Sequence, residues 1–153
     1  VRDLALGLRP SMLDDFGLQP ALEWQARDFT RRSNVPVELV LSGGLDSLSD
    51  QHRTCIYRVV QESLTNCVRH ARAGRISVSV HAHPDALEVT VSDDGVGLDP
   101  MRRRAGFGLR GIEERVRELG GRVSLRSATG QGATLAIWLP LNTREPALAR
   151  SAG

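Results

Sequence analysis

The spacing of apolar residues changes near residue 75, and this change limits the folds that the chain can adopt. Between residues 51 and 71, apolar side chains recur every three or four positions, which predicts a long amphipathic helix. From residue 76 onward they alternate with polar residues, which is the period of a half-buried strand. Residues 76–80 and 87–91 are therefore predicted to form two antiparallel strands joined by a short turn.

The other elements extend this pattern in both directions. Downstream, a helix at about 109–119 precedes a second strand pair at 123–126 and 134–139. Upstream, residues 21–32 are predicted to form a helix and residues 35–41 a short peripheral strand. This order predicts an α+β fold, a two-layer sandwich with helices on one face of a mixed, mostly antiparallel sheet.

Composition excludes several classes of protein. The 153 residues include no apolar run near the roughly 20 residues needed to cross a bilayer. The formal charge of +2 and the lack of aromatic residues among Arg102, Arg103 and Arg104 argue against nucleic-acid binding. Cys55 and Cys67 are predicted to be buried, reduced thiols. The expected core also includes the larger aromatic residues Trp24, Phe29, Tyr57 and Trp138.

A polar stripe follows the long helix beside its apolar one. Glu62, Asn66, Arg69 and His70 are spaced at i, i+4, i+7 and i+8, which places them on one helix face. An amide oxygen is a suitable ligand for Mg²⁺, and cationic side chains can contact phosphate oxygens. Taken alone, the stripe is equally compatible with an ordinary solvated helix face.

Two glycine-rich segments follow. Asp93-Asp94-Gly95-Val96-Gly97 ends an apolar strand, where a carboxylate can accept a hydrogen bond from an exocyclic amine such as that of adenine. Residues 106–111, Gly-Phe-Gly-Leu-Arg-Gly, open the next helix, whose free N–H groups and positive dipole end suit a phosphate. Either segment alone is also typical of an ordinary turn.

The ordered set of motifs resembles a known ATP-binding domain. E-x-x-x-N on a helix, D-x-G-x-G after a strand and G-x-G-L-x-G opening the next helix are similar to the domain shared by sensor histidine kinases, DNA gyrase B subunits, heat-shock ATPase chaperones and MutL. Residues 61–71 and Leu139-Pro140 resemble a bacterial histidine kinase in particular. Residues 8–18 resemble the segment before the ATP-binding domain in kinases of the nitrate-sensor type. The resemblance covers about residues 4–141 and implies the Bergerat-type ATP-binding fold.

The resemblance also implies roles for individual residues. Asn66 becomes the Mg²⁺ ligand and Glu62 its neighbour, and these two form the catalytic pair. Asp93 becomes the adenine reader, and residues 98–105 become a lid over the nucleotide. Relatives often have Thr directly after the glycine of the last strand, whereas here Ala133 takes that place. The implied ATP-binding residues are Asn66, Arg69, His70, Asp93, Gly95, Gly97, Gly106, Phe107, Gly108, Leu109, Gly111 and Thr134.

The histidine that kinases of this group phosphorylate is normally followed by an acidic residue. None of His52, His70, His81 and His83 is. We therefore expect residues 1–16 to be the end of a dimerisation helix and a linker, 17–141 the catalytic domain and 142–153 a flexible tail.

The expected function is the ATP-binding catalytic domain of a two-component sensor histidine kinase, with ATP and Mg²⁺ as cofactors. Its implied partners are its own upstream dimerisation and phosphoacceptor domain and a response regulator. The resemblance implies a homodimeric full-length parent, with or without a membrane anchor, with this domain in the cytoplasm, and a monomer for the fragment alone. The alternatives are a serine kinase of the anti-sigma type and a non-catalytic nucleotide-binding interaction module.

Overall fold

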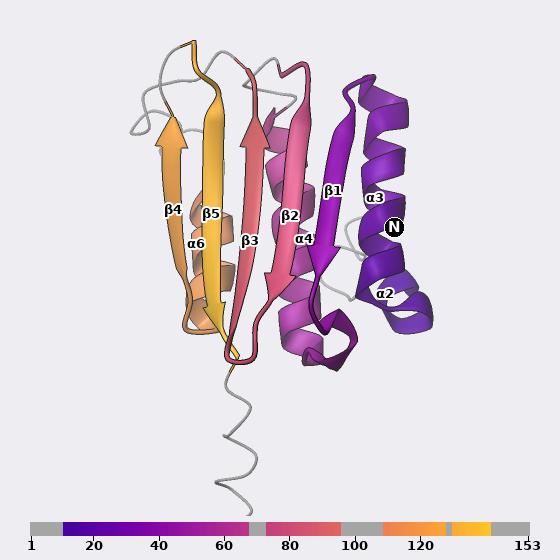
Figure 1. Cartoon of the computed structure of the whole chain (residues 1–153), viewed down its shortest axis with the longest axis vertical. Coiled ribbons are helices and arrows are strands. Elements are labelled where there is room, and N and C mark those ends of the chain that lie inside the picture. The colour runs from indigo at the N-terminus through magenta and orange to yellow at the C-terminus, as the bar shows by residue number, and fades with distance from the viewer. Residues whose placement is uncertain (1–10, 68–72, 96–108, 128–129, 142–153) are drawn as a thin grey trace, which may run out of the picture.

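The computed structural model describes residues 11–67, 73–95, 109–127 and 130–141. Its centre is a five-stranded sheet in the order β1-β2-β3-β5-β4 (Figure 1). Only the pairing of β1 with β2 is parallel, and the other neighbours are antiparallel. The strands are β1 Val37–Ser42, β2 Ile76–Ala82, β3 Ala86–Asp93, β4 Arg122–Ser127 and β5 Ala133–Pro140.

The helices cover one face of this sheet, as the sequence predicted. In Figure 1, α4 and α6 lie behind the strands, and α3 lies beside the edge strand β1. Ser49 caps α4 by accepting a hydrogen bond from the backbone N–H of His52 at 3.1 Å. The helical elements are α2 Ser11–Phe16, α3 Leu18–Ser33, the short 3₁₀ turn η1 Leu45–Ser47, α4 Asp50–Asn66 and α6 Leu109–Glu118.

The apolar core lies between the sheet and the helices. Strands β2 and β5 alternate buried and half-buried positions, so their apolar residues face the helices. Leu13 of α2 is buried in the same core, within the segment that the sequence analysis assigned to a linker. The largest fully buried side chains include Leu18, Leu22, Ile56, Leu64, Ile76, Leu87, Ile112 and Leu139.

The core prediction is right for two of the four large aromatic residues. Phe29 and Tyr57 are buried, but Trp24 is 42% exposed because the buried face of α3 runs through Leu22 and Gln25 instead. Trp138 is half-buried on the opposite face of β5 from the core. There its ring lies under the guanidinium of Arg122, 4.5 Å from the ring centroid. At both tryptophans, the face of the helix or strand on which the residue lies decided its exposure, and the hydrophobicity of the side chain did not.

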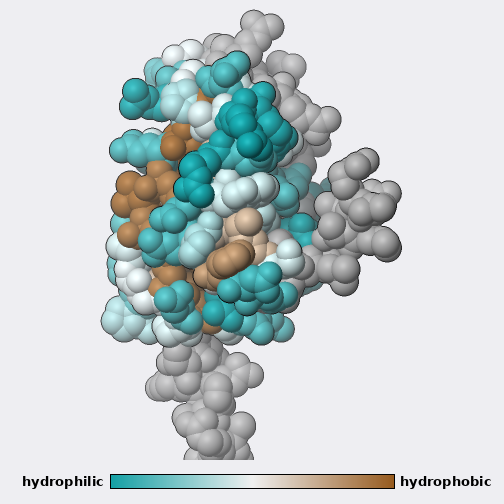
Figure 2. All heavy atoms as spheres, turned by 90° about the vertical axis from the view of Figure 1, so that its right-hand side faces the viewer, coloured by the Kyte–Doolittle hydropathy of each residue, from teal (hydrophilic) through white to brown (hydrophobic). Residues whose placement is uncertain are grey.

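The surface beside α2 and α3 is a mosaic of apolar and polar patches. Figure 2 shows this side, where brown areas are interrupted by teal ones. Among the described residues, the exposed large apolar side chains are Phe16, Trp24 and Val40. No helix in the described ranges combines the length and apolar composition needed to cross a bilayer.

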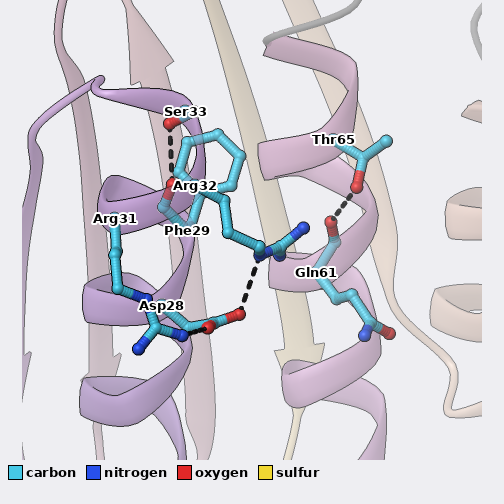
Figure 3. A network of polar contacts seen from close by, with 7 residues as sticks. All are labelled: Asp28, Phe29, Arg31, Arg32, Ser33, Gln61 and Thr65. Atoms are coloured by element: carbon cyan, nitrogen blue, oxygen red, sulfur yellow. Dashed lines mark hydrogen bonds and ion pairs between the residues drawn. The ribbon is translucent and has the colours of Figure 1, made fainter.

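Local polar contacts hold the C-terminal half of α3. Asp28 contacts Arg31 and accepts a hydrogen bond from Nε of Arg32 at 3.0 Å (Figure 3). The Ser33 hydroxyl donates to the Phe29 carbonyl at 2.7 Å, which supports the last turn of the helix. These contacts lie on one helix, so they fix its end without adding much to the stability of the fold.

Candidate nucleotide-binding site

The ends of four elements meet at one end of the sheet. Helix α4 ends at Asn66, β3 ends at Asp93, α6 begins at Leu109, and β5 begins at Ala133, which pairs with Asp93. Two of the three predicted motifs thus meet there, together with the first helical residue of the third. A cavity of about 20 Å³ lies between them, lined by Ser63, Asn66, Cys67, Val91, Asp93, Leu109, Leu125, Ala133 and Leu135.

Asp93 is held by hydrogen bonds to both carboxylate oxygens. Its Oδ1 accepts the backbone N–H of Gly95 at 2.8 Å, and its Oδ2 accepts the thiol of Cys67 at 3.5 Å. The first bond fixes the turn after β3, and the second ties the strand end to the end of α4. The carboxylate is therefore fixed in orientation before any ligand binds, as hydrogen bonding to one edge of a ligand requires.

The neighbouring carboxylate, Asp94, has a different task. Its Oδ1 accepts the backbone N–H groups of Gly74 and Arg75 at 2.8 and 3.0 Å. These two bonds favour the ionised form and hold the pKa of Asp94 below its usual value. Asp94 thus ties the start of β2 to the end of β3 and leaves Asp93 to face the cavity.

Gly132 packs directly against the backbone of Asp93. Its φ is +73°, and a β-carbon at this position would lie 2.1 Å from the Asp93 carbonyl oxygen. The obstacle is backbone and cannot rotate away. Only glycine allows the start of β5 to approach the end of β3 this closely.

Gly132→Ala is expected to lower the free energy of unfolding by more than about 2 kcal/mol and to weaken nucleotide binding, because the clash must displace Asp93. Gly130→Ala is the matched control. Gly130 also has a positive φ, +79°, but a β-carbon there meets nothing within 4 Å. Urea unfolding and calorimetry on both variants separate backbone strain from the collision. Equal affinities in the two variants would contradict the packing role of Gly132.

The remaining predicted site residues differ in whether they line the cavity. Leu109 is buried and lines the cavity, whereas Gly111 is exposed in the first turn of α6. Glu62 is exposed, one helical turn before Asn66. Arg69, His70, Gly97, Gly106, Phe107, Gly108 and the expected lid at 98–105 lie outside the described residues.

Thr134 is the one described member of the predicted ATP-binding set that the structure places on the opposite side of the sheet from the cavity. Because successive strand residues face opposite ways, Ala133 lines the cavity and Thr134 does not. The Thr134 hydroxyl instead forms a hydrogen bond with the Ser92 hydroxyl at 3.1 Å.

Sequence reasoning missed several residues of the cavity wall. Ser63 precedes Asn66 by three residues, so helical spacing alone could have placed it on the same face. Cys67 was predicted to be buried, but its contact with Asp93 joins residues 26 positions apart in the chain. Ala133 follows from the strand register, which no local pattern supplies.

The described donors suit a magnesium ion that is bound mainly by phosphates and water. Asn66 is 6% exposed, lines the cavity and offers one amide oxygen, with the carboxylate of Glu62 one turn away. The described part of the chain contains no group of three or more His, Cys, Asp or Glu side chains that would hold a metal by themselves. Magnesium commonly takes one or two protein oxygens and completes its shell from substrate and water.

Curated relatives align along almost the whole chain. The sensor histidine kinase MctS of Rhizobium johnstonii is 35% identical over 150 residues, covering 95% of this chain and 32% of that protein. The signal transduction histidine-protein kinase/phosphatase DegS of Brevibacillus brevis is 32% identical, covering 95% and 38%. The oxygen sensor histidine kinase NreB of Staphylococcus carnosus is 32% identical, covering 92% and 41%. The chain therefore spans about two fifths or less of the length of these relatives.

Solved structures support the fold. The histidine kinase domain of the blue-light activated kinase of Erythrobacter litoralis superposes with a TM-score of 0.62 at 23% identity, over 81% of this chain and 61% of that one. The mycobacterial sensor histidine kinase MprB gives a TM-score of 0.60 at 20% identity, over 79% and 92%.

A sequence model of one family matches residues 51–143, from the start of α4 to just beyond β5. This match covers more than half of the 153 residues and includes every element that lines the cavity. The chain belongs to the family of histidine kinase-, DNA gyrase B- and HSP90-like ATPases.

Proposed function

We propose that this chain is the ATP-binding catalytic domain of a two-component sensor histidine kinase, which binds Mg-ATP and transfers its γ-phosphoryl group to a histidine outside the chain. The observation that carries the proposal is the meeting of Asn66, Asp93 and the start of α6 around one cavity at one end of the sheet. The relatives named as histidine kinases, which align along more than nine tenths of the chain, support the choice within the family.

Each group in the site has a distinct task in this mechanism. Asp93 accepts a hydrogen bond from the adenine amine, and its two fixed oxygens set the position of the base. The positive end of the α6 dipole favours the phosphates at the start of that helix. The enzyme then contributes mainly position and electrostatic stabilisation, because phosphoryl transfer passes through a loose transition state.

Magnesium completes the proposed site. Asn66 would hold it, with the Glu62 carboxylate near its water shell. When bound, the ion neutralises charge on the phosphate oxygens and on the leaving group. Asn66 lies in the last turn of α4 and lines the cavity.

The proposed acceptor histidine and partners lie outside this chain. Each of the four histidines precedes an arginine, an alanine or a proline, whereas the acceptor in this group of kinases is normally followed by an acid. We propose a dimerisation and phosphoacceptor segment as the immediate partner, a response regulator as the next one, a homodimeric parent, and the cytoplasm as the location of this domain. The relatives' greater length supports a longer parent protein.

The test is phosphorylation in trans. The chain alone is expected to bind Mg-ATP and to label itself hardly at all with ³²P. Mixing it with a separately made dimerisation segment of its parent should produce phosphate that is labile to acid and stable to base on that segment, because the partner supplies the nucleophile. An aspartate- or serine-linked product, or stable labelling of any of the chain's own histidines, would contradict the proposal.

A further inference from the structure

The side chain of Ser63 is a polar group buried without a partner. It lies on the inner face of α4 and is 4% exposed. Among the described residues, its hydroxyl oxygen forms no hydrogen bond. A buried hydroxyl without a hydrogen bond destabilises the folded chain, so such a group calls for an explanation in function.

The hydroxyl belongs to the wall of the cavity beside Asp93. The cavity, at about 20 Å³, is large enough for one more polar atom of the size of a water molecule. Of the described residues that line it, Ser63 is the one with a hydroxyl group, and most of the others are apolar. The hydroxyl of Thr134 is not available there, because it pairs with Ser92 on the other side of the sheet.

Asp93 and Ser63 together offer a matched pair of hydrogen-bonding groups. An ionised carboxylate only accepts hydrogen bonds, and both Asp93 oxygens already receive one from the protein. A serine hydroxyl can donate. Adenine presents an amine donor next to the ring acceptor N1, which is complementary to one acceptor and one donor side by side. Guanine presents the reverse order at the same edge, an oxygen acceptor followed by an N–H donor.

We propose that Ser63 is a specificity-determining residue for the base, whose hydroxyl donates a hydrogen bond to N1 of adenine while Asp93 accepts from the amine. This inference rests on the proposed function, because it takes Asp93 as the adenine reader. It assigns to α4 a contact with the base in addition to the metal contact proposed for Asn66, three residues later. The contact satisfies the buried hydroxyl when ATP is bound.

The first experiment compares two variants that each remove one hydroxyl from α4. Ser63→Ala is expected to weaken ATP and ADP binding about tenfold, the loss of one hydrogen bond to a base acceptor. Thr65→Ala is the control: the Thr65 hydroxyl is exposed and donates to the Gln61 carbonyl at 3.0 Å (Figure 3). It should leave the affinity within twofold. The melting temperature of Ser63→Ala should be unchanged or higher, because the variant removes an unpaired buried group.

The second experiment varies the ligand. In 1-deaza-ATP a C–H replaces N1, so the unmodified chain should bind it about tenfold more weakly than ATP. Ser63→Ala should bind the two nucleotides almost equally, since the partner of N1 is already gone. This comparison within one variant holds even if the substitution disturbs the fold slightly.

The outcomes separate this inference from the proposed function. Equal ATP affinity in the unmodified chain and Ser63→Ala, or additive losses from the variant and from 1-deaza-ATP, would overturn the role of Ser63 alone. Failure of the unmodified chain to bind ATP at all would overturn the proposed function, and the role of Ser63 with it.

Discussion

Replacing Asn66 with alanine or aspartate is expected to reduce phosphoryl transfer to the dimerisation segment at least about a hundredfold, while ADP binding without magnesium stays within about threefold. Alanine removes the amide oxygen proposed to hold Mg²⁺, and aspartate keeps the size but adds negative charge beside the phosphates. Neither change removes a group that is assigned to the base. The measurements are initial rates of ³²P transfer and calorimetric titration with ADP in EDTA.

Because Asn66 is buried, the aspartate variant is needed to separate loss of the metal ligand from loss of packing volume. Because Asn66 is 6% exposed, alanine leaves space next to the cavity, and thermal unfolding should accompany each titration. Aspartate nearly preserves the volume. If both variants lost metal-free ADP affinity to the same degree as an Asp93 variant, the stripe on α4 would have a structural role and no role toward the metal.

The second large effect concerns the base. Asp93→Asn is expected to weaken ATP and ADP alike, by about 10- to 100-fold, because the amine loses a charged acceptor and the Gly95 and Cys67 donors lose theirs. The unmodified chain should also reject GTP, since guanine would place its oxygen against the carboxylate. Calorimetry that found GTP bound as tightly as ATP would overturn the assignment of Asp93.

Asp94→Asn provides the control for this experiment, one residue along. Asp94 accepts its hydrogen bonds from Gly74 and Arg75, so its loss should lower stability and leave nucleotide affinity within a few-fold. The role of Asp94 in stability also predicts how the free energy of unfolding depends on pH. Because the pKa of Asp94 is lowered in the folded chain, its stabilisation is present at neutral pH and disappears as the pH falls through the titration of the carboxyl group.

Local patterns predicted the elements of this fold well, because each element has one apolar face. The helical spacing before residue 71 and the alternation after residue 76 correspond to α4, β2 and β3. Helix α2 escaped prediction because six residues carry too little periodicity to separate from a loop. The parallel pairing of β1 with β2 also has no local signal, since it depends on how α4 returns the chain across the sheet.

Only the site residues that belong to a recognisable motif could be predicted from the sequence. Asn66 and Asp93 could be named because their residue types and spacing indicate their chemistry. Helical spacing could have placed Ser63 on the face of Asn66, but a serine there gives no chemical signal of its own, and Ala133 depends on which face of β5 turns inward. The contact of Gly132 with the Asp93 backbone is likewise set by strand register, which arises only when the whole sheet assembles.

The positions of the two tryptophans determine which spectroscopic signals this molecule can give. Trp24 contacts solvent, Trp138 lies under a guanidinium on the outer sheet face, and neither lines the cavity beside Asp93. Intrinsic fluorescence therefore reports on two surface environments away from the described wall of the cavity. An unchanged emission spectrum during a titration would carry no information about binding, so a fluorescent nucleotide or heat must supply the readout.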